Sequence, residues 1–243
     1  MTWKQVNGLA GVGLLQSEVE WGKRNDVLSG TLSQLINDYV DKSAKFGLDV
    51  GCQAGDPIDM LVARTTLAWA GIDPKIESGI LSRKGSHLHH GSADKIPFPD
   101  SSFDCVVLAN VYEHILPSLY NTSLAEINRV LNDRGILVGQ LPNPYFPIES
   151  HSRLPFMGWL PYRIQKLYWR LTPVPWEHDF FVVTISDLRK RAVNLGFQTI
   201  LIRNFNYPAE VFPRSVLWAV KLMEPVMRVM PWAWQFVFRK VGM

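Results

Sequence analysis

Short apolar runs alternate with segments of helical periodicity between residues 46 and 139. The expected strands are 46–50, 66–72, 86–91, 103–109 and 135–139, and the expected helices are 56–63, 74–82 and 124–131. The run from Phe103 to Ala109 is long and rich in β-branched residues, which is typical of a parallel strand buried on both faces. Strands that alternate with helices form right-handed crossovers and a parallel sheet. The sequence therefore predicts an α/β fold.

The segments outside this alternation complete the expected domain organisation. Residues 1–45 contain amphipathic helical periodicity, and 46–208 form the main domain. The main domain includes an insertion at 142–180, and it resumes with a strand at 180–184, a helix at 185–195 and a strand at 197–202. These additions give a mostly parallel sheet of seven strands. Residues 209–243 are expected to form an apolar, basic, helical tail.

The composition is that of a globular chain with one domain. Of its 243 residues 47% are hydrophobic and 19% are charged, and the net charge of +3 is too small to indicate a nucleic-acid partner. Cys52 and Cys105 lie in apolar segments without zinc-ligand spacing, so we expect two buried, reduced thiols. The N-terminus does not resemble a signal peptide, and no apolar run is long enough to span a membrane, so a cytoplasmic location is expected.

A glycine-containing turn, Leu48-Asp-Val-Gly51-Cys-Gln-Ala-Gly55, connects the first expected strand to the helix that follows it. Glycine allows a tight turn and lets a ligand approach the backbone closely. In open parallel sheets, ligands bind outside the carboxyl ends of the strands. Asp73 follows the next strand, 22 residues after Gly51, and a carboxylate there can accept hydrogen bonds from both ribose hydroxyls.

Two cofactors suit such a turn, NAD and S-adenosylmethionine. The spacing of Gly51 and Gly55 does not fit the dinucleotide fingerprint. Asp49 precedes the first glycine by two positions, where a carboxylate attracts the ammonium group of S-adenosylmethionine. The pattern therefore favours the methyl donor, and NAD-dependent oxidoreduction remains a distant alternative.

Several blocks from Phe46 to Asn143 resemble class I S-adenosylmethionine-dependent methyltransferases of the quinone-biosynthesis-like type, with a methyltransferase type 11 domain. The blocks occur in the family's order: Leu48-Asp-Val-Gly-Cys-Gln-Ala-Gly55, Gly71-Ile-Asp-Pro74, the stretch from Gly91 to Asp104, Leu108-Ala-Asn-Val-Tyr-Glu-His-Ile115, and the stretch from Arg129 to Leu137. The resemblance implies a Rossmann-like methyltransferase fold with S-adenosyl-L-methionine as cofactor.

The resemblance also implies which residues bind the donor. Asp49, Gly51 and Gly55 would line its methionine and ribose side, Asp73 would hold the ribose, the backbone of Ala93 would meet the adenine, and Asn110 would lie near the methionine portion. Two positions depart from the family. Gln53 replaces the middle glycine, and Ser92 stands where an acid often binds the adenine amino group, so that Ser92 itself or Asp94 would take that role. Both departures bear on donor affinity.

Methyl transfer depends mainly on alignment of donor and acceptor, and it needs a base only when the acceptor must lose a proton. His114 and His151 are the leading candidates for that base, ahead of His178, Tyr112 and Tyr145. His87 and His89 share a face of one expected strand, but no third ligand is evident nearby, and no metal site is expected.

The expected acceptor side is rich in aromatic residues. Residues 142–180 would form a cap over the sheet's carboxyl edge, with an acceptor pocket or a small satellite core made by Tyr145, Phe146, Phe156, Trp159, Tyr162, Tyr168 and Trp169. Arg153 and Arg163 could hold a carboxylate or phosphate. The basic, Trp-rich segment 209–243 could lie on an anionic membrane surface, which would make the protein peripheral at the inner membrane face, or it could pack on the domain or between subunits.

The favoured function is methyl transfer to a small hydrophobic, glycolipid or saccharide-type acceptor, with oxygen as the favoured atom. Two alternatives remain open: carbon methylation of a quinone or isoprenoid, and a binding protein that keeps the fold without turnover. The sequence does not identify the acceptor or the oligomeric state.

Overall fold

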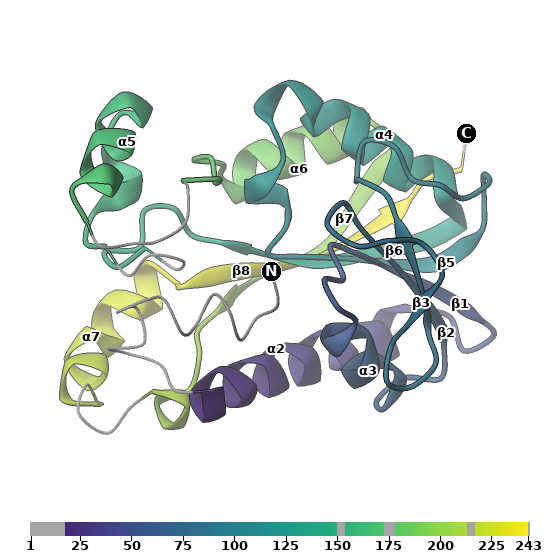
Figure 1. Ribbon diagram of the computed structural model, residues 1–243, viewed down its shortest axis with the longest axis horizontal. Helices are drawn as coiled ribbons and strands as arrows, with labels where there is room; N and C mark the ends of the chain where they lie inside the picture. Colours follow the sequence, from purple (N-terminus) through teal and green to yellow (C-terminus); the bar gives the residue numbers. More distant parts are fainter. Residues whose placement is uncertain (1–17, 150–153, 173–177, 213–216, 243) are drawn as a thin grey trace.

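The computed structural model describes residues 18–149, 154–172, 178–212 and 217–242. One sheet lies between two layers of helices (Figure 1). Helices α2 (Glu18–Tyr39) and α3 (Asp56–Val62) cover one face, and α4 (Tyr120–Val130) and α6 (Ile185–Asn194) cover the other. This arrangement confirms the predicted α/β, Rossmann-like fold.

The sheet has eight strands in the order β3-β4-β2-β1-β5-β6-β8-β7. Strands β1 (Phe46–Val50), β2 (Ala68–Asp73), β4 (His87–His90), β5 (Phe103–Ala109) and β6 (Leu131–Pro142) form its parallel part. Strand β1 is paired with β2 on one side and β5 on the other, so the strand order reverses there. In such sheets a crevice opens at the carboxyl ends of the strands where the order reverses.

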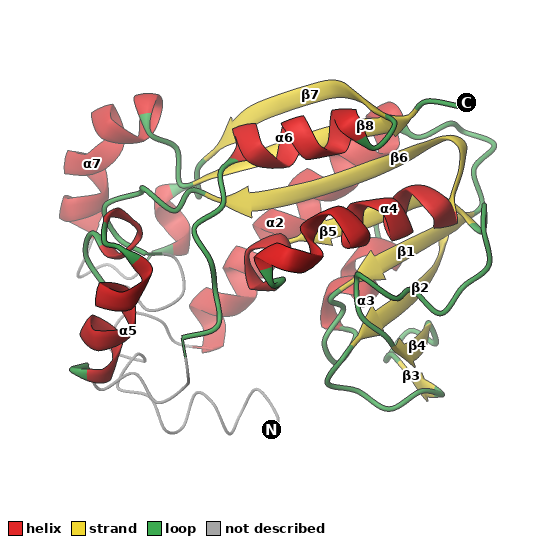
Figure 2. Ribbon diagram, turned by 90° about the horizontal axis from the view of Figure 1, so that it is seen from above, coloured by secondary structure: helices red, strands yellow, loops and turns green. Residues whose placement is uncertain are grey.

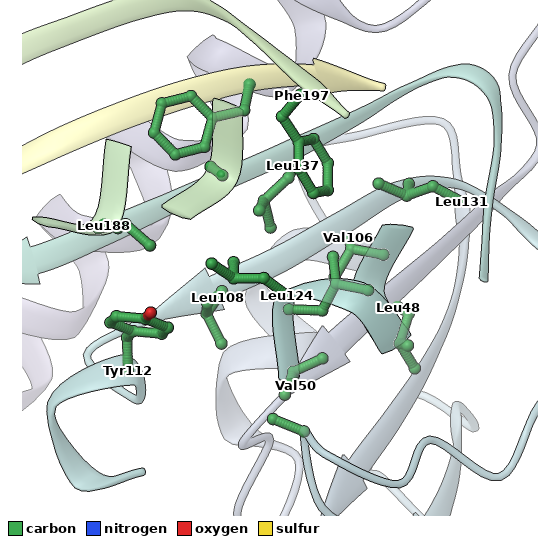
Figure 3. Packing of buried hydrophobic residues seen from close by; sticks show 14 of the residues in the cluster. Leu48, Val50, Val106, Leu108, Tyr112, Leu124, Leu131, Leu137, Leu188 and Phe197 are labelled. Atoms are coloured by element: carbon green, nitrogen blue, oxygen red, sulfur yellow. The ribbon is translucent and has the colours of Figure 1, made fainter. Parts of the chain in front are cut away.

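Strand β5 shows why the sheet is buried on both faces. Val106 and Leu108 pack with Leu48, Leu124 and Leu188 in the cluster under α4 and α6 (Figure 3). Cys105 and Val107 point the other way, into a second cluster with side chains of α2 and α3. Successive residues of a strand alternate between its faces, and here both faces meet apolar layers. Cys52 and Cys105 are both free and buried, as expected.

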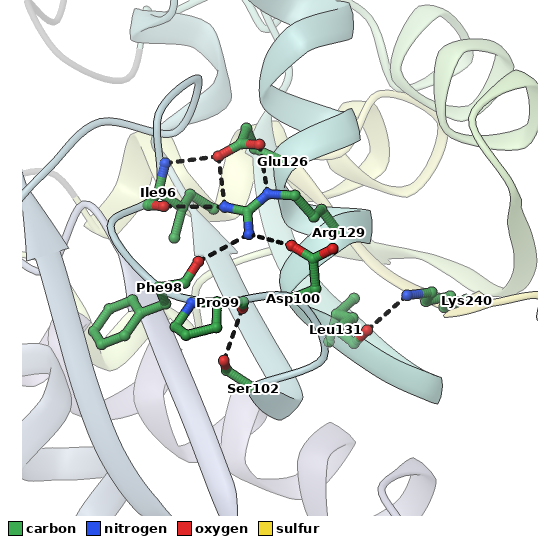
Figure 4. A network of polar contacts seen from close by, with 9 residues as sticks. All are labelled: Ile96, Phe98, Pro99, Asp100, Ser102, Glu126, Arg129, Leu131 and Lys240. Atoms are coloured by element: carbon green, nitrogen blue, oxygen red, sulfur yellow. Dashed lines mark hydrogen bonds and ion pairs between the residues drawn. The ribbon is translucent and has the colours of Figure 1, made fainter.

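A polar network fixes the loop that precedes β5. Arg129 on α4 donates to the carbonyl oxygens of Ile96 and Phe98 and to the carboxylates of Asp100 and Glu126 (Figure 4). Glu126 also accepts the backbone N–H of Ile96 at 3.0 Å. Hydrogen bonds to charged groups are stronger than neutral ones. The network therefore anchors the segment that follows Ser92–Asp94 against α4.

The C-terminal tail departs from its prediction. Residues 217–229 form helix α7 (Leu217–Val229), but Ala233–Lys240 form strand β8, which lies antiparallel between β6 and β7 (Phe197–Phe205). Phe236, Val237 and Phe238 of β8 are fully buried in the sheet's two clusters. The predicted domain boundary at residue 209 is therefore wrong, because the tail supplies an interior strand of the domain. Both faces of β8 are covered by the protein, so this strand cannot contact a membrane.

Two smaller predictions also fail. The helix expected at 74–82 is absent: Gly79 has φ +88°, its N–H bonds to Leu88, and the short strand β3 (Ile80–Leu81) pairs antiparallel with β4. The strand expected at 180–184 is extended chain outside the sheet, where the N–H of Phe181 bonds to the carbonyl of Glu113.

A single long helix, α2, accounts for most of the described part of residues 1–45.

The insertion contributes the 3-10 helix η4 (Met157–Trp159) and helix α5 (Tyr162–Arg170). Met157, Trp169 and Phe180 form a small cluster of their own. Both views place α5 at the same end of the molecule as α7 (Figures 1 and 2).

Candidate functional site: a cavity at the carboxyl edge of the sheet

The residues expected to bind the donor end neighbouring strands. Asp49 is the penultimate residue of β1, Asp73 ends β2, Ser92 follows β4 and Asn110 follows β5. Because these strands are parallel and adjacent, their carboxyl ends share one edge of the sheet. The fold thus brings together, at one edge of the sheet, residues that are up to about sixty positions apart in the sequence.

A cavity of about 1090 Å³ opens at this edge between the sheet and α2. Asp49, Gly51, Gln53, Asn110 and His114 line it. The other expected donor-binding residues border the same strand ends without lining the cavity itself; these are Gly55, Asp73, Ser92, Ala93 and Asp94. Ligand cavities usually measure about 300–1,000 Å³, so this cavity is slightly larger than that range.

Asp49 is an unusual carboxylate. It is 4% exposed, and its Oδ2 has no hydrogen-bond partner among the described residues. Burial, together with the neighbouring charge of Asp73, raises the pKa of Asp49 to about 8. A cation placed in the cavity beside Asp49 would compensate both effects.

Asp73 already supports the glycine turn. Its Oδ2 accepts the N–H of Gln53 at 3.0 Å, and its Oδ1 accepts the N–H of Lys75 at 2.8 Å. A carboxylate oxygen has a second lone pair, so these bonds leave Asp73 able to accept a hydroxyl as well. Asp73 therefore ties the turn after β1 to the end of β2.

The turn is built on left-handed backbone. Gly51, Gln53 and Gly55 have φ of +83°, +52° and +92°. A Cβ on Gly51 would lie 2.4 Å from the side chain of Val111, so this position has room only for glycine. Gln53 adopts the strained angle with a full side chain, at a cost of about 1 kcal/mol, and that side chain is exposed at the cavity.

A chain of side-chain amides orients Asn110. Gln140 on β6 is buried and donates its Nε2 to Asn110 Oδ1 at 3.1 Å. Gln235 on β8 donates its Nε2 to Gln140 Oε1 at 3.4 Å. Arg203 on β7 donates in turn to Gln235 Oε1 at 3.0 and 2.7 Å. Because Asn110 accepts through its oxygen, its amide N–H groups are left for other acceptors. Gln140 was not predicted as a site residue; the available signal was an amide side chain directly after an apolar strand-like run.

The segment Ser92–Asp94 makes a tight loop after β4. Ser92 and Lys95 form an isolated antiparallel bridge, and Ala93 is buried under the loop. The N–H of Gly91 bonds to the carbonyl of Asp73 at 3.4 Å, which places this loop beside the end of β2. The Arg129–Glu126 network anchors the following residues (Figure 4).

Of the histidines considered as bases, His114 is the one that the structure brings to the cavity. Its Nδ1 lies 3.1 Å from the carbonyl oxygen of Asp179 and 3.4 Å from the carboxylate Oδ1. Donation from Nδ1 to Asp179 selects the tautomer in which Nε2 is the basic nitrogen. His151 lies outside the described residues.

The remaining candidates lie elsewhere. His178 packs against the rings of Trp169 and Phe180, and burial lowers its pKa. Tyr112 is a core residue stacked on Tyr120, and burial raises its pKa. Tyr145 is on the surface against Trp159. None of these three lines the cavity.

The end of the cavity away from the glycine turn contains a buried cation between aromatic rings. Arg24 of α2 is 5% exposed, and its guanidinium lies 4.4 Å from the ring centroid of Tyr207 and 5.5 Å from that of Trp232. Burial lowers the pKa of Arg24, but an arginine remains charged in proteins. All three residues line the cavity. No sequence pattern had linked them.

Among the described residues of the insertion, the aromatic side chains expected to form an acceptor pocket do not line the cavity. Phe146 packs on Trp232 in one cluster and Trp169 joins the small cluster of the insertion, while Phe156, Trp159 and Tyr162 are exposed. None of them lines the cavity, and neither does Arg163; Arg153 lies outside the described residues. The satellite-core interpretation of this segment therefore fits better than the pocket interpretation.

Two further observations concern metals and membranes. Among the described residues, no group of three or more His, Cys, Asp and Glu side chains is placed to hold a metal ion. Within the same part of the chain, no helix combines the length and the apolar character needed to cross a bilayer.

Comparisons with known proteins agree with this geometry. Residues 48–139 match the family model described as a methyltransferase domain. No curated protein matched the sequence. Solved structures are similar in fold: a Pyrococcus horikoshii protein is 16% identical with a TM-score of 0.63, covering 98% of this chain and 97% of that one.

Two other similar structures carry names that indicate their function. An S-adenosylmethionine-dependent methyltransferase from Mesorhizobium loti is 15% identical with a TM-score of 0.60, covering 89% of this chain and 100% of that one. The 1,6-didemethyltoxoflavin N1-methyltransferase from Burkholderia thailandensis, solved with S-adenosylhomocysteine, is 12% identical with a TM-score of 0.53, covering 88% and 78%.

The fold, the family match and the order of the motifs define a class of enzyme. Residues 48–139 form a methyltransferase domain, which identifies the protein as a methyltransferase. Its fold is shared with S-adenosylmethionine-dependent methyltransferases of known structure. Its acceptor is not identified by these relationships.

Proposed function

We propose that this enzyme transfers a methyl group to an oxygen of a small hydrophobic, glycolipid or saccharide-type acceptor bound in the cavity under α2. The observation that carries the proposal is the division of one cavity into two ends. Asp49, with its unpartnered oxygen, lies at one end, and Arg24 lies between aromatic rings at the other. One end suits a cationic amino acid, and the other suits an apolar, oxygen-bearing molecule.

The donor end is assigned to the residues at the strand ends. In this proposal Asp49 holds the ammonium group, Asp73 accepts the ribose hydroxyls, and the glycine turn admits the donor without a Cβ in its path at Gly51. The amide of Asn110, oriented by Gln140, faces the methionine portion. Ser92, Ala93 and Asp94 form the adenine side, with Ser92 or Asp94 as partner of the amino group.

The acceptor end is assigned to Arg24, Tyr207 and Trp232. Aromatic faces bury apolar or sugar surface, and a guanidinium can bind an acceptor's carboxylate, phosphate or hydroxyl oxygen. A cavity of about 1090 Å³ has room for an acceptor beside the donor.

His114 is proposed as the base. When bound, the cofactor supplies an electrophilic methyl group on a sulfonium centre. With the cofactor bound, its methyl group would pass to the acceptor oxygen, and the electron pair of the carbon–sulfur bond would stay with sulfur. His114 Nε2 takes the proton that the acceptor hydroxyl loses, and Asp179 stabilises the resulting imidazolium through Nδ1.

A methyl-transfer assay tests the proposal. Radiolabelled donor is incubated with the protein and with lipid or aqueous extracts of the source cell, and Asp49→Asn serves as the blank. We expect label in the lipid phase or in a saccharide fraction, in a product that behaves as an ether or ester. Label in quinones or isoprenoids would instead identify carbon methylation. Donor binding without label in any fraction would support the binding-protein alternative.

A further inference from the structure

Helix α5 presents apolar side chains to solvent. Ile164, Leu167 and Leu171, at the helix's end, are spaced three and four residues apart, so they form one stripe, and they are 49%, 58% and 77% exposed. Gln165 and Trp169, on the other side, are buried. A helix of a globular protein usually buries its apolar stripe, but α5 buries one face and also exposes a second apolar stripe.

Helix α7 repeats the arrangement. Met227 is buried and Met223 packs with it against Trp232, while Trp218, Leu222 and Val229 are 71%, 72% and 84% exposed. The spacing of these three residues places them together on the outer face of the helix. Large exposed apolar patches on a protein indicate a surface that binds a partner or a membrane.

Basic residues accompany both stripes. Helix α5 contains the exposed residues Arg163, Lys166 and Arg170 and no acidic residue, and α7 contains Lys221 and Arg228 against one acid, Glu224. The two helices together carry more positive charge than the whole chain, whose net charge is +3, so the rest of the molecule is close to neutral. Both helices lie at one end of the molecule (Figures 1 and 2).

We infer that this end of the molecule, the outer faces of α5 and α7, docks on an anionic lipid bilayer. Protein–protein interfaces are depleted in lysine, whereas helices that lie on membranes combine Trp and Leu with Lys and Arg, whose aliphatic stems lie along the apolar surface. The charge matches an anionic headgroup layer. The inference goes beyond the expected membrane contact of 209–243, because it adds α5 and excludes β8.

The position of this surface has a consequence for the cavity. The inner face of α7 packs in the same cluster as Tyr207 and Trp232, which line the end of the cavity away from the glycine turn. Docking would place that end beside the bilayer. Vesicle binding itself does not depend on the acceptor or on methyl transfer, so it can be tested without either.

Sedimentation with vesicles tests the inference. The full chain is mixed with phosphatidylcholine vesicles, with and without phosphatidylglycerol, at low and high salt. Two double variants remove the stripes, Leu167→Ser with Leu171→Ser and Trp218→Ser with Leu222→Ser. The control is Ile80→Ser with Leu81→Ser, which removes two apolar residues of β3 that are 46% and 55% exposed. Circular dichroism and donor affinity report whether each variant is folded.

We expect binding to the anionic vesicles that weakens with salt, and a loss of at least about tenfold in each stripe variant with the control unchanged. Equal binding by wild type and folded stripe variants would overturn the inference, as would equal binding to neutral vesicles. Concentration-dependent dimers that the stripe variants abolish, without vesicle binding, would also overturn it and assign the surface to a second copy of the chain.

Discussion

The two ends of the cavity are built by different means. At the donor end, every proposed contact comes from the carboxyl end of a parallel strand or from the turn after it, and the strand order alone brings Asp49, Asp73 and Asn110 to one edge. At the acceptor end, Arg24, Tyr207 and Trp232 come from α2 and from the chain around β7 and β8, and their packing brings them together. The positions of the donor-end residues therefore follow from the sheet topology, whereas those of the acceptor-end residues follow from tertiary packing.

The largest expected effect is on kcat, and it concerns His114, the proposed base between the two ends of the cavity. Because His114 takes the acceptor's proton in the proposed reaction, His114→Gln should lower kcat by about 10²–10⁴-fold. Donor affinity, measured by calorimetry, should stay within about twofold, since the donor end is untouched. His87→Gln, an exposed histidine on β4, is the control. An unchanged kcat in His114→Gln would show that the acceptor needs no base at this position.

The next largest effect is on the free energy of unfolding of the donor-free protein, and it concerns Asp49. The pKa of Asp49 in the folded protein, about 8, is above the usual value for an aspartate, so the folded state disfavours the charged form. This group therefore costs the fold increasing stability as the pH rises from about 4 to about 8. Asp49→Asn removes the cost and should stabilise the donor-free protein by as much as a few kcal/mol at pH 8.

Denaturant unfolding at pH 5 and pH 8 measures this difference. The stabilisation by Asp49→Asn should be larger at pH 8 than at pH 5. Asp56→Asn, an exposed carboxylate at the same cavity, provides the matched comparison and should show no such increase. A variant less stable than wild type at pH 8 would mean that Asp49 is compensated in the donor-free protein.

A smaller effect is expected at the acceptor end. Arg24→Met keeps an unbranched apolar side chain and removes the charged guanidinium, so KM for the acceptor should rise by about tenfold, as for the loss of one hydrogen bond to a charged group. The donor dissociation constant should not change. Arg64→Met, whose guanidinium pairs with Asp26 at the cavity rim, is the control. An equal loss of donor affinity would contradict the separation of the two ends.

The smallest effect concerns the loop beside the donor end. The charged hydrogen bonds of Glu126 to Arg129 and to the Ile96 N–H lower its pKa. Its contribution to stability is therefore present above the unfolded-state pKa and is lost as the pH falls through the folded-state value. Glu126→Gln should cost about 1 kcal/mol at pH 7, discounted for its partial exposure, and less at pH 4. Thermal unfolding at the two values of pH measures it; an equal cost at both would mean that charge is not involved.

The residues proposed for the donor end could be placed at one edge of the sheet from the sequence, because their signals are local. Each strand is a short apolar run, and the residue that follows it points to a shared edge once the strands are parallel, which places Asp49, Asp73 and Asn110 together without further information. Gln53 could also be identified from the sequence as a departure from glycine, and in the structure it has a left-handed φ of +52°.

The acceptor end had no comparable signal. Arg24 lies in a helix whose charged residues all look exposed, and only the packing of α2 on the last strands buries it. The alternation in Trp232–Phe238 was interpreted as part of an amphipathic tail, although the period of two belongs to a strand. Pairing between β6 and β8 joins residues about a hundred positions apart, and such pairing leaves no mark in a local pattern.

The donor dissociation constant as a function of pH, in wild type and Asp49→Asn, tests the central claim most directly. The donor's amino group stays mostly protonated between pH 6 and pH 7.5. If that ammonium binds ionised Asp49, wild type must release a proton below about pH 8, so the affinity advantage of wild type over the variant should grow by about tenfold per pH unit across this interval. An advantage that stays constant with pH, or is absent, would show that Asp49 does not bind the donor's cation.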